Sequence, residues 1–228
     1  MIAYLMGGLG NQMFQYAAGL AVAKRLGESL ELNTTFYDSN DSREYQLFHF
    51  PISSRVTDSF APQINEVGFP YQEINQSGMM VGYWQSEKYF SDISDQIRKE
   101  FALPKTDLGM VAVHVRRGDY LHLPQVFHTL DVDYYEEARK HFPNCEFIAF
   151  SDDPKWVKEN LPWVEVVEGN PAIVDMALMA SCEGVIMANS SFSWWAAWLG
   201  NKKVVAPSKW FTCRHDTRDL IPDRWIKI

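Results

Sequence analysis

Two adjacent arginines follow an apolar segment near the middle of the chain, in the stretch VAVHVRRGDY. Alternation along a strand places His114 and Arg116 on one face, with Arg117 at the exit and Gly118 allowing the backbone to turn. Two guanidinium groups at a strand end can hold a diphosphate through bidentate hydrogen bonds and can neutralise charge on a departing phosphate. Asp119 could orient one of them. The alternative is an ordinary surface ion pair, worth about 0 to 1 kcal/mol.

A second apolar segment, FIAF, also ends in charged residues, Asp152 and Asp153. A carboxylate at this place could accept hydrogen bonds from the N1–H and the exocyclic amine of guanine, most simply through Asp152. Asp153 could instead cap the helix that begins near Pro154. The two interpretations can both hold.

A third segment, GVIM, leads through a polar turn into the aromatic sequence SFSWWAAWL. Ser190 and Ser191 at the start of this helix could donate hydroxyl and backbone N–H bonds to the phosphate that the arginines hold. Trp194, Trp195 and Trp198 recur at helical spacing, which is more typical of core packing than of a ligand site.

A glycine-rich turn, GGLG, joins the first strand to the first helix. Its glycines allow close approach of a ligand to the backbone, and free N–H groups at a helix start favour an anion. The dinucleotide fingerprint is incomplete, because Met13 stands where a third glycine is needed. Asn11 and Gln12 could present amides to a ligand, or Asn11 could simply cap the helix.

The sequence Asp131-Val132-Asp133 matches the D-x-D pattern by which many sugar transferases hold a divalent metal. It directly precedes a predicted helix, so a role for these aspartates at the helix N-terminus is the simpler interpretation. No His/Cys cluster has zinc spacing. The paired arginines would make a metal unnecessary, so we expect no metal and no other cofactor.

The elements that must position these residues are predicted by hydrophobic periodicity. The first part contains a strand from Ile2, a helix over 12–26, a polar, irregular region over 33–78 of loops or small elements, and a helix over 86–101 behind a Ser86 cap. From Met110 onward strands and helices alternate, which indicates a parallel sheet with covering helices. The predicted fold class is α/β, with two Rossmann-like lobes, 1–104 and 105–228, whose parallel sheets face a cleft.

Composition excludes several classes of function. The formal net charge of -8 argues against a nucleic-acid surface, and no apolar run is long enough for stable membrane insertion. Three widely spaced cysteines favour a reduced, cytoplasmic chain, with peripheral association at a membrane where lipid-linked glycans are built left open.

The motifs GGLGNQMFQYA, GYWQSEKYF, HVRRGDY, FSDDPKWV and NSSFSWWAAWLG together resemble, in order and along the whole chain, those of glycosyltransferase family 11, the α-1,2-fucosyltransferases. The resemblance implies a GT-B fold, GDP-L-fucose as donor and no metal. It implies transfer with inversion to a hydroxyl of an acceptor glycan, O2 of a galactoside. HVRRGD is also similar to a motif of α-1,6-fucosyltransferases and protein O-fucosyltransferases.

The resemblance further implies roles for the residues of the C-terminal lobe. Arg116 would bind the β-phosphate and stabilise the departing GDP, while His114 and Arg117 would support the nucleotide. Asp119, which could orient one arginine, is expected with them at the donor site. Asp152 would recognise guanine.

The remaining donor contacts implied by the resemblance come from two turns. They are Ser190, Ser191 and Phe192 in the second lobe, and Gly10, Asn11 and Gln12 in the first lobe, which would close over the donor. For the general base we take His128, with His122, Glu87 and Asp119 as rivals, because a histidine can titrate near neutral pH.

One departure from the family is length. The chain is shorter than the usual member, and the shortfall falls around residues 33–80 and after Tyr120, in segments expected to shape the acceptor side. Two alternatives stay open. One is a metal-dependent transferase that uses Asp131 and Asp133, and the other is a non-catalytic relative that binds a GDP-sugar or a glycan.

Overall fold

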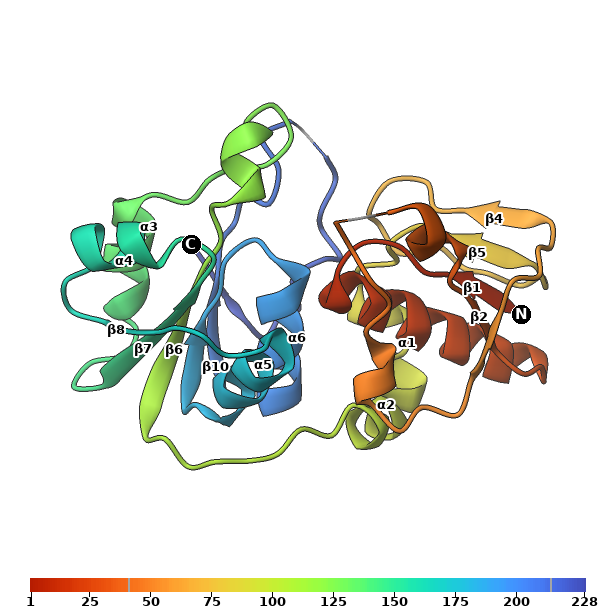
Figure 1. The fold of residues 1–228 in the computed structure, drawn as a ribbon, viewed down its shortest axis with the longest axis horizontal. Helices are drawn as coiled ribbons and strands as arrows, with labels where there is room; N and C mark the ends of the chain where they lie inside the picture. The colour runs from red at the N-terminus through yellow and green to blue at the C-terminus, as the bar shows by residue number, and fades with distance from the viewer. Residues whose placement is uncertain (41, 214) are drawn as a thin grey trace. The chain divides into compact units, whose positions relative to one another are not determined.

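Residues 1–40, 42–213 and 215–228 are described by a computed structural model. The chain divides into two units (Figure 1): unit 1 is Met1–Ala102 with Asp216–Pro222, and unit 2 is Leu103–His215 with Asp223–Ile228. Each unit contains one parallel sheet with helices packed against it, so the predicted α/β class with two parallel sheets is confirmed.

The sheet of unit 1 has five parallel strands in the order β3-β2-β1-β5-β4. The strands are short: β1 (Ile2–Tyr4), β2 (Glu31–Asn33), β3 (Arg55–Thr57), β4 (Gln63–Asn65) and β5 (Met79–Val81). Because all five run in the same direction, their carboxyl ends share one edge of the sheet. Such an edge is where ligands bind in open α/β sheets.

Helix α1 (Leu9–Leu26) covers this sheet. It starts three residues earlier than the periodicity predicted, directly after the glycine turn, and ends at Gly27, whose φ of 70° is the left-handed conformation of a helix C-terminus. Gly19 lies on the sheet side of the helix, where a Cβ would come 3.2 Å from the Cβ of Ala3. The missing side chain lets the helix approach the sheet closely.

The region 33–78, expected to hold loops or small elements, contains the short strands β3 and β4. The sequence did not locate them because most of their side chains are exposed and show no apolar pattern. The predicted helix over 86–101 is two 3-10 turns, Glu87–Tyr89 and Ser91–Ile93, followed by helix α2 (Ser94–Glu100).

The Ser86 cap is confirmed, since its hydroxyl accepts a hydrogen bond from the Lys88 N–H. Behind this cap the apolar side chains Phe90, Ile97 and Phe101 are buried as their spacing predicted. The first two turns of this segment have 3-10 geometry. A 3-10 turn places apolar residues on one face at nearly the same interval as an α-helical turn, so the same side chains are buried.

The sheet of unit 2 has six parallel strands in the order β11-β10-β9-β6-β7-β8. They are β6 (Met110–Val115), β7 (Glu146–Ser151), β8 (Glu165–Val167), β9 (Gly184–Ile186), β10 (Lys203–Ala206) and β11 (Ile226–Lys227). The helices are α3 (Val132–Arg139), α4 (Pro154–Asn160), α5 (Ala172–Ser181) and α6 (Ser191–Gly200). Helices α3 and α4 pack on one face and α5 and α6 on the other (Figure 1), and the predicted alternation from Met110 onward is confirmed.

The tryptophans of α6 belong to the core, as predicted. Trp194, Trp195 and Trp198 are at most 2 % exposed, and their rings pack on one another at centroid distances of 5.2 to 6.3 Å. At the end of α6 that follows the polar turn, the partly exposed residues are Ser191 and Phe192.

The chain returns to unit 1 near its end. The predicted division between residues 104 and 105 assigned all later residues to the second lobe, but Asp216–Pro222 belong to unit 1. Within this segment Asp219 accepts hydrogen bonds from Lys88 Nζ at 2.5 Å and from the Tyr71 N–H at 2.8 Å, and Leu220 and Ile221 are buried. These long-range contacts have no signature in local periodicity.

Candidate functional site

The two arginines lie at the carboxyl end of β6, each held by carboxylates. Arg116 lies between Asp119, 2.7 Å from its Nη2, and Asp152, 3.1 Å from its Nη1. Arg117 pairs through Nε with Asp153 at 3.3 Å, and its guanidinium lies 4.1 Å from the ring centroid of Trp156. The arrangement fixes both guanidinium groups and surrounds two cations with three carboxylates, so the concentrated positive charge is balanced locally.

Asp152 also fixes the backbone of the arginine turn. Its Oδ1 accepts a hydrogen bond from the Arg117 N–H at 2.9 Å, and its Oδ2 lies against Gly118, where a Cβ would come within 2.7 Å. Glycine is needed at this position because any side chain would displace the carboxylate from Arg116. The expected turn at Gly118 is therefore present, and it serves the contact between neighbouring strand ends.

Asp153 has two roles. Its Oδ1 accepts a hydrogen bond from the Trp156 N–H at 3.1 Å and so caps α4, as predicted, while Oδ2 pairs with Arg117. The sequence did not predict the ion pair with Arg117, because no local pattern shows that the ends of β6 and β7 are neighbours.

His114 is buried on β6, and its environment keeps the imidazole neutral. Burial in the sheet, together with the nearby charge of Arg116, lowers the pKa of His114 to about 3. Its ring centroid lies 5.7 Å from that of Phe192, and its Nδ1 has no hydrogen-bond partner among the described residues. A neutral imidazole can accept or donate a hydrogen bond without adding charge next to the arginines.

The serine turn follows β9, the strand next to β6 in the sheet. Ser190 is the N-cap of α6, and its hydroxyl accepts a hydrogen bond from the Phe192 N–H at 3.3 Å. Ser191 and Phe192 are half-buried in the first turn. Because β9, β6 and β7 are neighbours, the serine turn, the arginine turn and Asp152 gather at one edge of the sheet.

Asn189 is a structural residue that sequence reasoning missed. It is fully buried, and its Nδ2 donates hydrogen bonds to the carbonyl oxygens of His128 at 2.8 Å and Trp210 at 2.7 Å. The Tyr120 hydroxyl donates to the Asn189 carbonyl at 2.8 Å. One buried amide thus ties the serine turn to the loop after the arginine motif. The only feature of the sequence that could have indicated this role was an asparagine between a predicted strand and a polar turn.

That loop is ordered by aromatic packing. Phe127 stacks on Tyr120 with ring centroids 4.1 Å apart and an interplanar angle of 5°, and it contacts Phe211 at 6.0 Å. The Thr212 N–H donates to the Val126 carbonyl at 2.9 Å. The segment 120–130 is therefore packed against the segment 210–212.

His128, the expected general base, lies in this loop beside a pocket of about 210 Å³. The pocket is also lined by Asp131, Glu137 and Lys209. The main-chain carbonyl of His128 accepts a hydrogen bond from Asn189, which joins this residue to the serine turn. Its rival His122 is exposed in the 3-10 turn Asp119–His122.

The expected donor contacts of the glycine turn belong to unit 1, at the start of α1. Gln12 is fully buried, and its amide bonds the carbonyls of Gly7 and Glu44 and the Gln46 N–H. These bonds use its amide inside unit 1, so Gln12 shapes the turn. Asn11 accepts a hydrogen bond from Gln85 at 2.8 Å and is half-buried.

The D-x-D sequence is explained by the start of α3. Asp131 is the N-cap of this helix, and its Oδ1 accepts a hydrogen bond from the Tyr134 N–H at 3.1 Å, while Asp133 lies in the first turn. The helix-terminal interpretation is confirmed. Over residues 1–40, 42–213 and 215–228, no three His, Cys, Asp or Glu side chains are grouped so that they could hold a metal ion.

The fold and the site together suit a protein that binds a phosphate-bearing ligand at the carboxyl ends of parallel strands. The sequence profile of glycosyl transferase family 11 matches residues 62–226. The chain belongs to this family, and it is a glycosyltransferase.

Several relatives agree with this assignment. An α-1,2-colitosyltransferase from Escherichia coli is 30% identical, with 100% of this chain and 98% of the relative covered. The O-antigen biosynthesis glycosyltransferase WbnK, also from E. coli, is 29% identical with both chains covered completely. Galactoside α-(1,2)-fucosyltransferase 2 from Oryctolagus cuniculus is 28% identical over 85% of this chain and 65% of the relative.

The alignment with the colitosyltransferase extends over 285 positions, more than the 228 residues of this chain. The relative therefore carries segments that this chain lacks, as the comparison of motifs predicted.

Among solved structures, the fucosyltransferase NodZ from Bradyrhizobium has a TM-score of 0.50 at 18% identity, covering 86% of this chain and 90% of that chain. This similarity concerns the fold, and the GT-B class expected from the motifs is confirmed. Of the described residues, none forms a helix long and apolar enough to cross a membrane.

Proposed function

We propose that this chain transfers L-fucose from GDP-L-fucose to a hydroxyl of a galactose-containing acceptor, with inversion and formation of an α-1,2 linkage. The observation that carries the proposal is the arginine pair at the end of β6, flanked by Asp152 on β7 and by the serine turn after β9. The similarity to an α-(1,2)-fucosyltransferase supports the choice of sugar and linkage.

The diphosphate of the donor would bind at the arginine turn. Arg116 has five N–H groups, and its two carboxylate partners leave some of them for a phosphate oxygen. The first-turn N–H groups of α6 and the hydroxyl of Ser191 add donors at the same edge, where the helix dipole favours negative charge. The guanidinium of Arg117 packs on the ring of Trp156 and would add the second positive charge.

The guanine base would meet Asp152. Each carboxylate oxygen has two lone pairs, so bonds to the Arg117 N–H and to Arg116 leave acceptor capacity for the N1–H and exocyclic amine of guanine. Neutral His114 and the ring of Phe192 would support the nucleotide and the fucose.

In the chemical step an acceptor hydroxyl oxygen attacks C1 of fucose. The bond from C1 to the phosphate oxygen breaks and GDP leaves with the electron pair. Arg116 stabilises the negative charge that develops on the β-phosphate. His128 takes the hydroxyl proton. Because Arg116 and Arg117 neutralise the charge of the diphosphate, the reaction needs no metal.

A transfer assay tests the proposal directly. The chain is incubated with GDP-L-fucose and lactose, with and without EDTA, and fucosyl-lactose and GDP are measured. We expect equal rates of product formation under both conditions. Loss of activity in EDTA would support a metal-dependent transferase that uses Asp131 and Asp133, and GDP binding without turnover would support a non-catalytic relative.

A second donor has a specific observation in its favour. The colitosyltransferase is 30% identical over the whole of this chain, and colitose is fucose without its 3-hydroxyl group. We expect GDP-L-fucose to be preferred. A site that hydrogen-bonds a substrate hydroxyl strongly rejects the analogue that lacks it, so the ratio of kcat/KM for the GDP-linked forms of the two sugars decides the donor.

The remaining expectations are also part of the proposal. We expect a cytoplasmic protein, and the three cysteines, Cys145, Cys182 and Cys213, are free thiols as the reduced state requires. No nucleic-acid partner is expected for a chain of net charge -8.

A further inference from the structure

A half-buried carboxylate, Glu66, directly follows β4 and lies against the turn that follows β5. We call this turn, residues 82–85, the GYWQ turn. The Oε2 of Glu66 accepts a hydrogen bond from the Tyr83 N–H at 2.6 Å, and its Oε1 accepts one from the Trp84 N–H at 2.9 Å. Both carboxylate oxygens are therefore bonded to consecutive backbone N–H groups of one turn.

Trp84 has a backbone conformation that needs such support. Its φ of 55° lies in the left-handed region, which a bulky side chain rarely adopts, and the residue is 1 % exposed. Strained residues of this kind persist only where the surroundings hold them, and they cluster at ligand-binding sites. The indole Nε1–H is buried without a hydrogen-bond partner among the described residues, so the polar contacts that hold this residue are made by its backbone.

The packing of the GYWQ turn leaves room for Glu66 and for nothing larger. Gly82 lies so close to Glu66 that a Cβ there would come 2.3 Å from the Cβ of Glu66. The Gly82 carbonyl accepts a hydrogen bond from Gln15 Nε2 of helix α1 at 3.0 Å. Burial raises the pKa of Glu66, and the two N–H bonds oppose this change. The carboxylate is thus kept in a partly desolvated place by its bonds to the turn.

Gln85 connects the GYWQ turn to the glycine turn. Gln85 is buried, and its Nε2 donates a hydrogen bond to Asn11 Oδ1 at 2.8 Å. Because the oxygen of the Asn11 amide is used in this way, its Nδ2 is the group left to donate to a ligand. This Nδ2 lies over Gly7, where a Cβ would come within 2.6 Å. The orientation of the Asn11 amide therefore depends on Gln85, which directly follows the strained residue.

We propose that Glu66 is a positioning residue for donor binding. By holding Trp84 in the left-handed conformation it places Gln85, which turns the Asn11 amide so that its N–H groups can bond the donor. This inference rests on the proposed function and on the donor contact that the family resemblance gives to the glycine turn. An N–H donor suits the oxygen atoms of a nucleotide sugar, and Glu66 acts through the GYWQ turn without contacting the donor.

The test compares the affinity for GDP-L-fucose, measured by calorimetry, in the unchanged chain and in Glu66→Gln. The variant keeps the shape of the side chain, but one oxygen becomes an NH₂ group that faces a backbone N–H. We expect the Kd to rise at least about fivefold, because a hydrogen bond to a charged group is lost from the chain of contacts. Glu73→Gln makes the same change at an exposed carboxylate of unit 1 and, as the matched control, should leave the Kd within about twofold.

A double-mutant cycle with Gln85→Ala separates positioning from a general loss of stability. If Glu66 acts through Gln85, Glu66→Gln should change the Kd by less than about twofold once residue 85 is already alanine. A merely structural role would give the same rise in both backgrounds. Gln85→Glu places a carboxylate beside Asn11 Oδ1 and should turn the amide, so its Kd should rise at least as much as that of Gln85→Ala. Cooperative unfolding in urea shows that each variant is folded.

Equal Kd values for Glu66→Gln and Glu73→Gln would overturn the proposal, as would an undiminished effect of Glu66→Gln in the Gln85→Ala background. Fucosyl transfer with an unchanged Kd in Glu66→Gln would refute this inference and leave the proposed function intact. Binding of GDP-L-fucose that depends on Glu66 and Gln85 together, in a chain that transfers no fucose, would support the inference and refute the proposed function. Absence of GDP-L-fucose binding in the unchanged chain would overturn both.

Discussion

Replacement of Arg116 is the most informative change that the structure suggests. Its guanidinium is fixed between Asp119 and Asp152, so its remaining N–H groups are already oriented before a ligand arrives. Removal of one preorganised donor at a developing negative charge lowers kcat by about 10² to 10³, or about 2.7 to 4 kcal/mol. We expect Arg116→Ala to reduce fucosyl transfer by at least this factor.

A second effect acts on binding. The arginine turn combines two guanidinium groups with the carboxylates of Asp119, Asp152 and Asp153. Without Arg116 one cation faces three carboxylates, and the site becomes more negative by one charge. The affinity for GDP should therefore fall together with kcat, because the unpaired carboxylates repel the diphosphate.

Arg116→Lys separates charge from geometry. Lysine keeps the positive charge but lacks the planar fork, so it cannot hold both carboxylates and a phosphate oxygen at once. We expect GDP affinity to be partly restored and kcat to stay at least about tenfold below that of the unchanged chain.

The assay measures single-turnover release of GDP together with the Kd for GDP by calorimetry. Arg139→Ala is the matched control, because Arg139 also belongs to unit 2, pairs with Glu136 and lies 4.9 Å from the ring centroid of Trp163. The control should keep its transfer rate within about twofold, as exposed ion pairs contribute little. Transfer by Arg116→Ala within threefold of the unchanged chain would refute the role given to this arginine.

Three further predictions concern residues around the arginine turn. Gly118→Ala should push the Asp152 carboxylate away from Arg116, since the new Cβ would lie 2.7 Å from Oδ2; calorimetry should show GDP binding weakened by roughly tenfold with the fold retained, and unchanged affinity would contradict this. Asn189→Ala leaves the carbonyls of His128 and Trp210 without their buried donor, so the free energy of unfolding in urea should fall by about 2 to 4 kcal/mol. Hydrogen exchange should then rise in segment 120–130, whereas a uniform rise over unit 2 would argue against a local anchor. Finally, His114 stays neutral in the folded chain down to about pH 3 but takes a proton near pH 6.5 when unfolded, so this residue should lower stability as pH falls between these values, by about 2 kcal/mol at pH 5. His114→Gln should show a correspondingly smaller difference between urea unfolding at pH 5 and at pH 7, and an equal difference would contradict the buried neutral state.

Much of the fold was predictable because it is encoded locally. In unit 2 the four helices and the strands β6 and β7 are six to ten residues long, with clear apolar periods. In unit 1 the strands β3 and β4 have three residues each and carry exposed side chains, so no period could reveal them.

The sequence by itself determined which residue types stand at the strand ends and helix starts of the candidate site. It placed Arg116 and Arg117 at a strand end, Gly118 at the turn and Ser190 at a helix start, because each of these positions follows from a period, a turn residue or a cap within a few neighbouring residues. The ordered series of motifs also indicated the family, because each motif is a short run of neighbouring residues.

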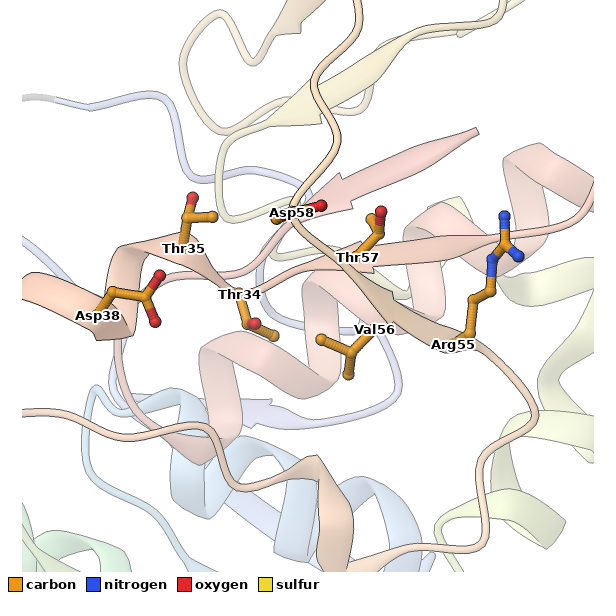
Figure 2. A pocket seen from close by; sticks show the side chains of 7 residues that line it. All are labelled: Thr34, Thr35, Asp38, Arg55, Val56, Thr57 and Asp58. Carbon is orange, nitrogen blue, oxygen red and sulfur yellow. The ribbon is translucent and has the colours of Figure 1, made fainter.

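Only the tertiary structure decided which side chains meet. Asp152 and Asp153 hold the arginines because β6 and β7 are adjacent in the sheet, and Asn189 holds the carbonyl of His128 across 61 positions of sequence. A polar pocket of about 530 Å³ at the carboxyl ends of β2 and β3 (Figure 2) likewise exists because these two strands end side by side. Such contacts depend on strand order and loop packing, which are set by the energy of the whole core and leave no trace in the local pattern.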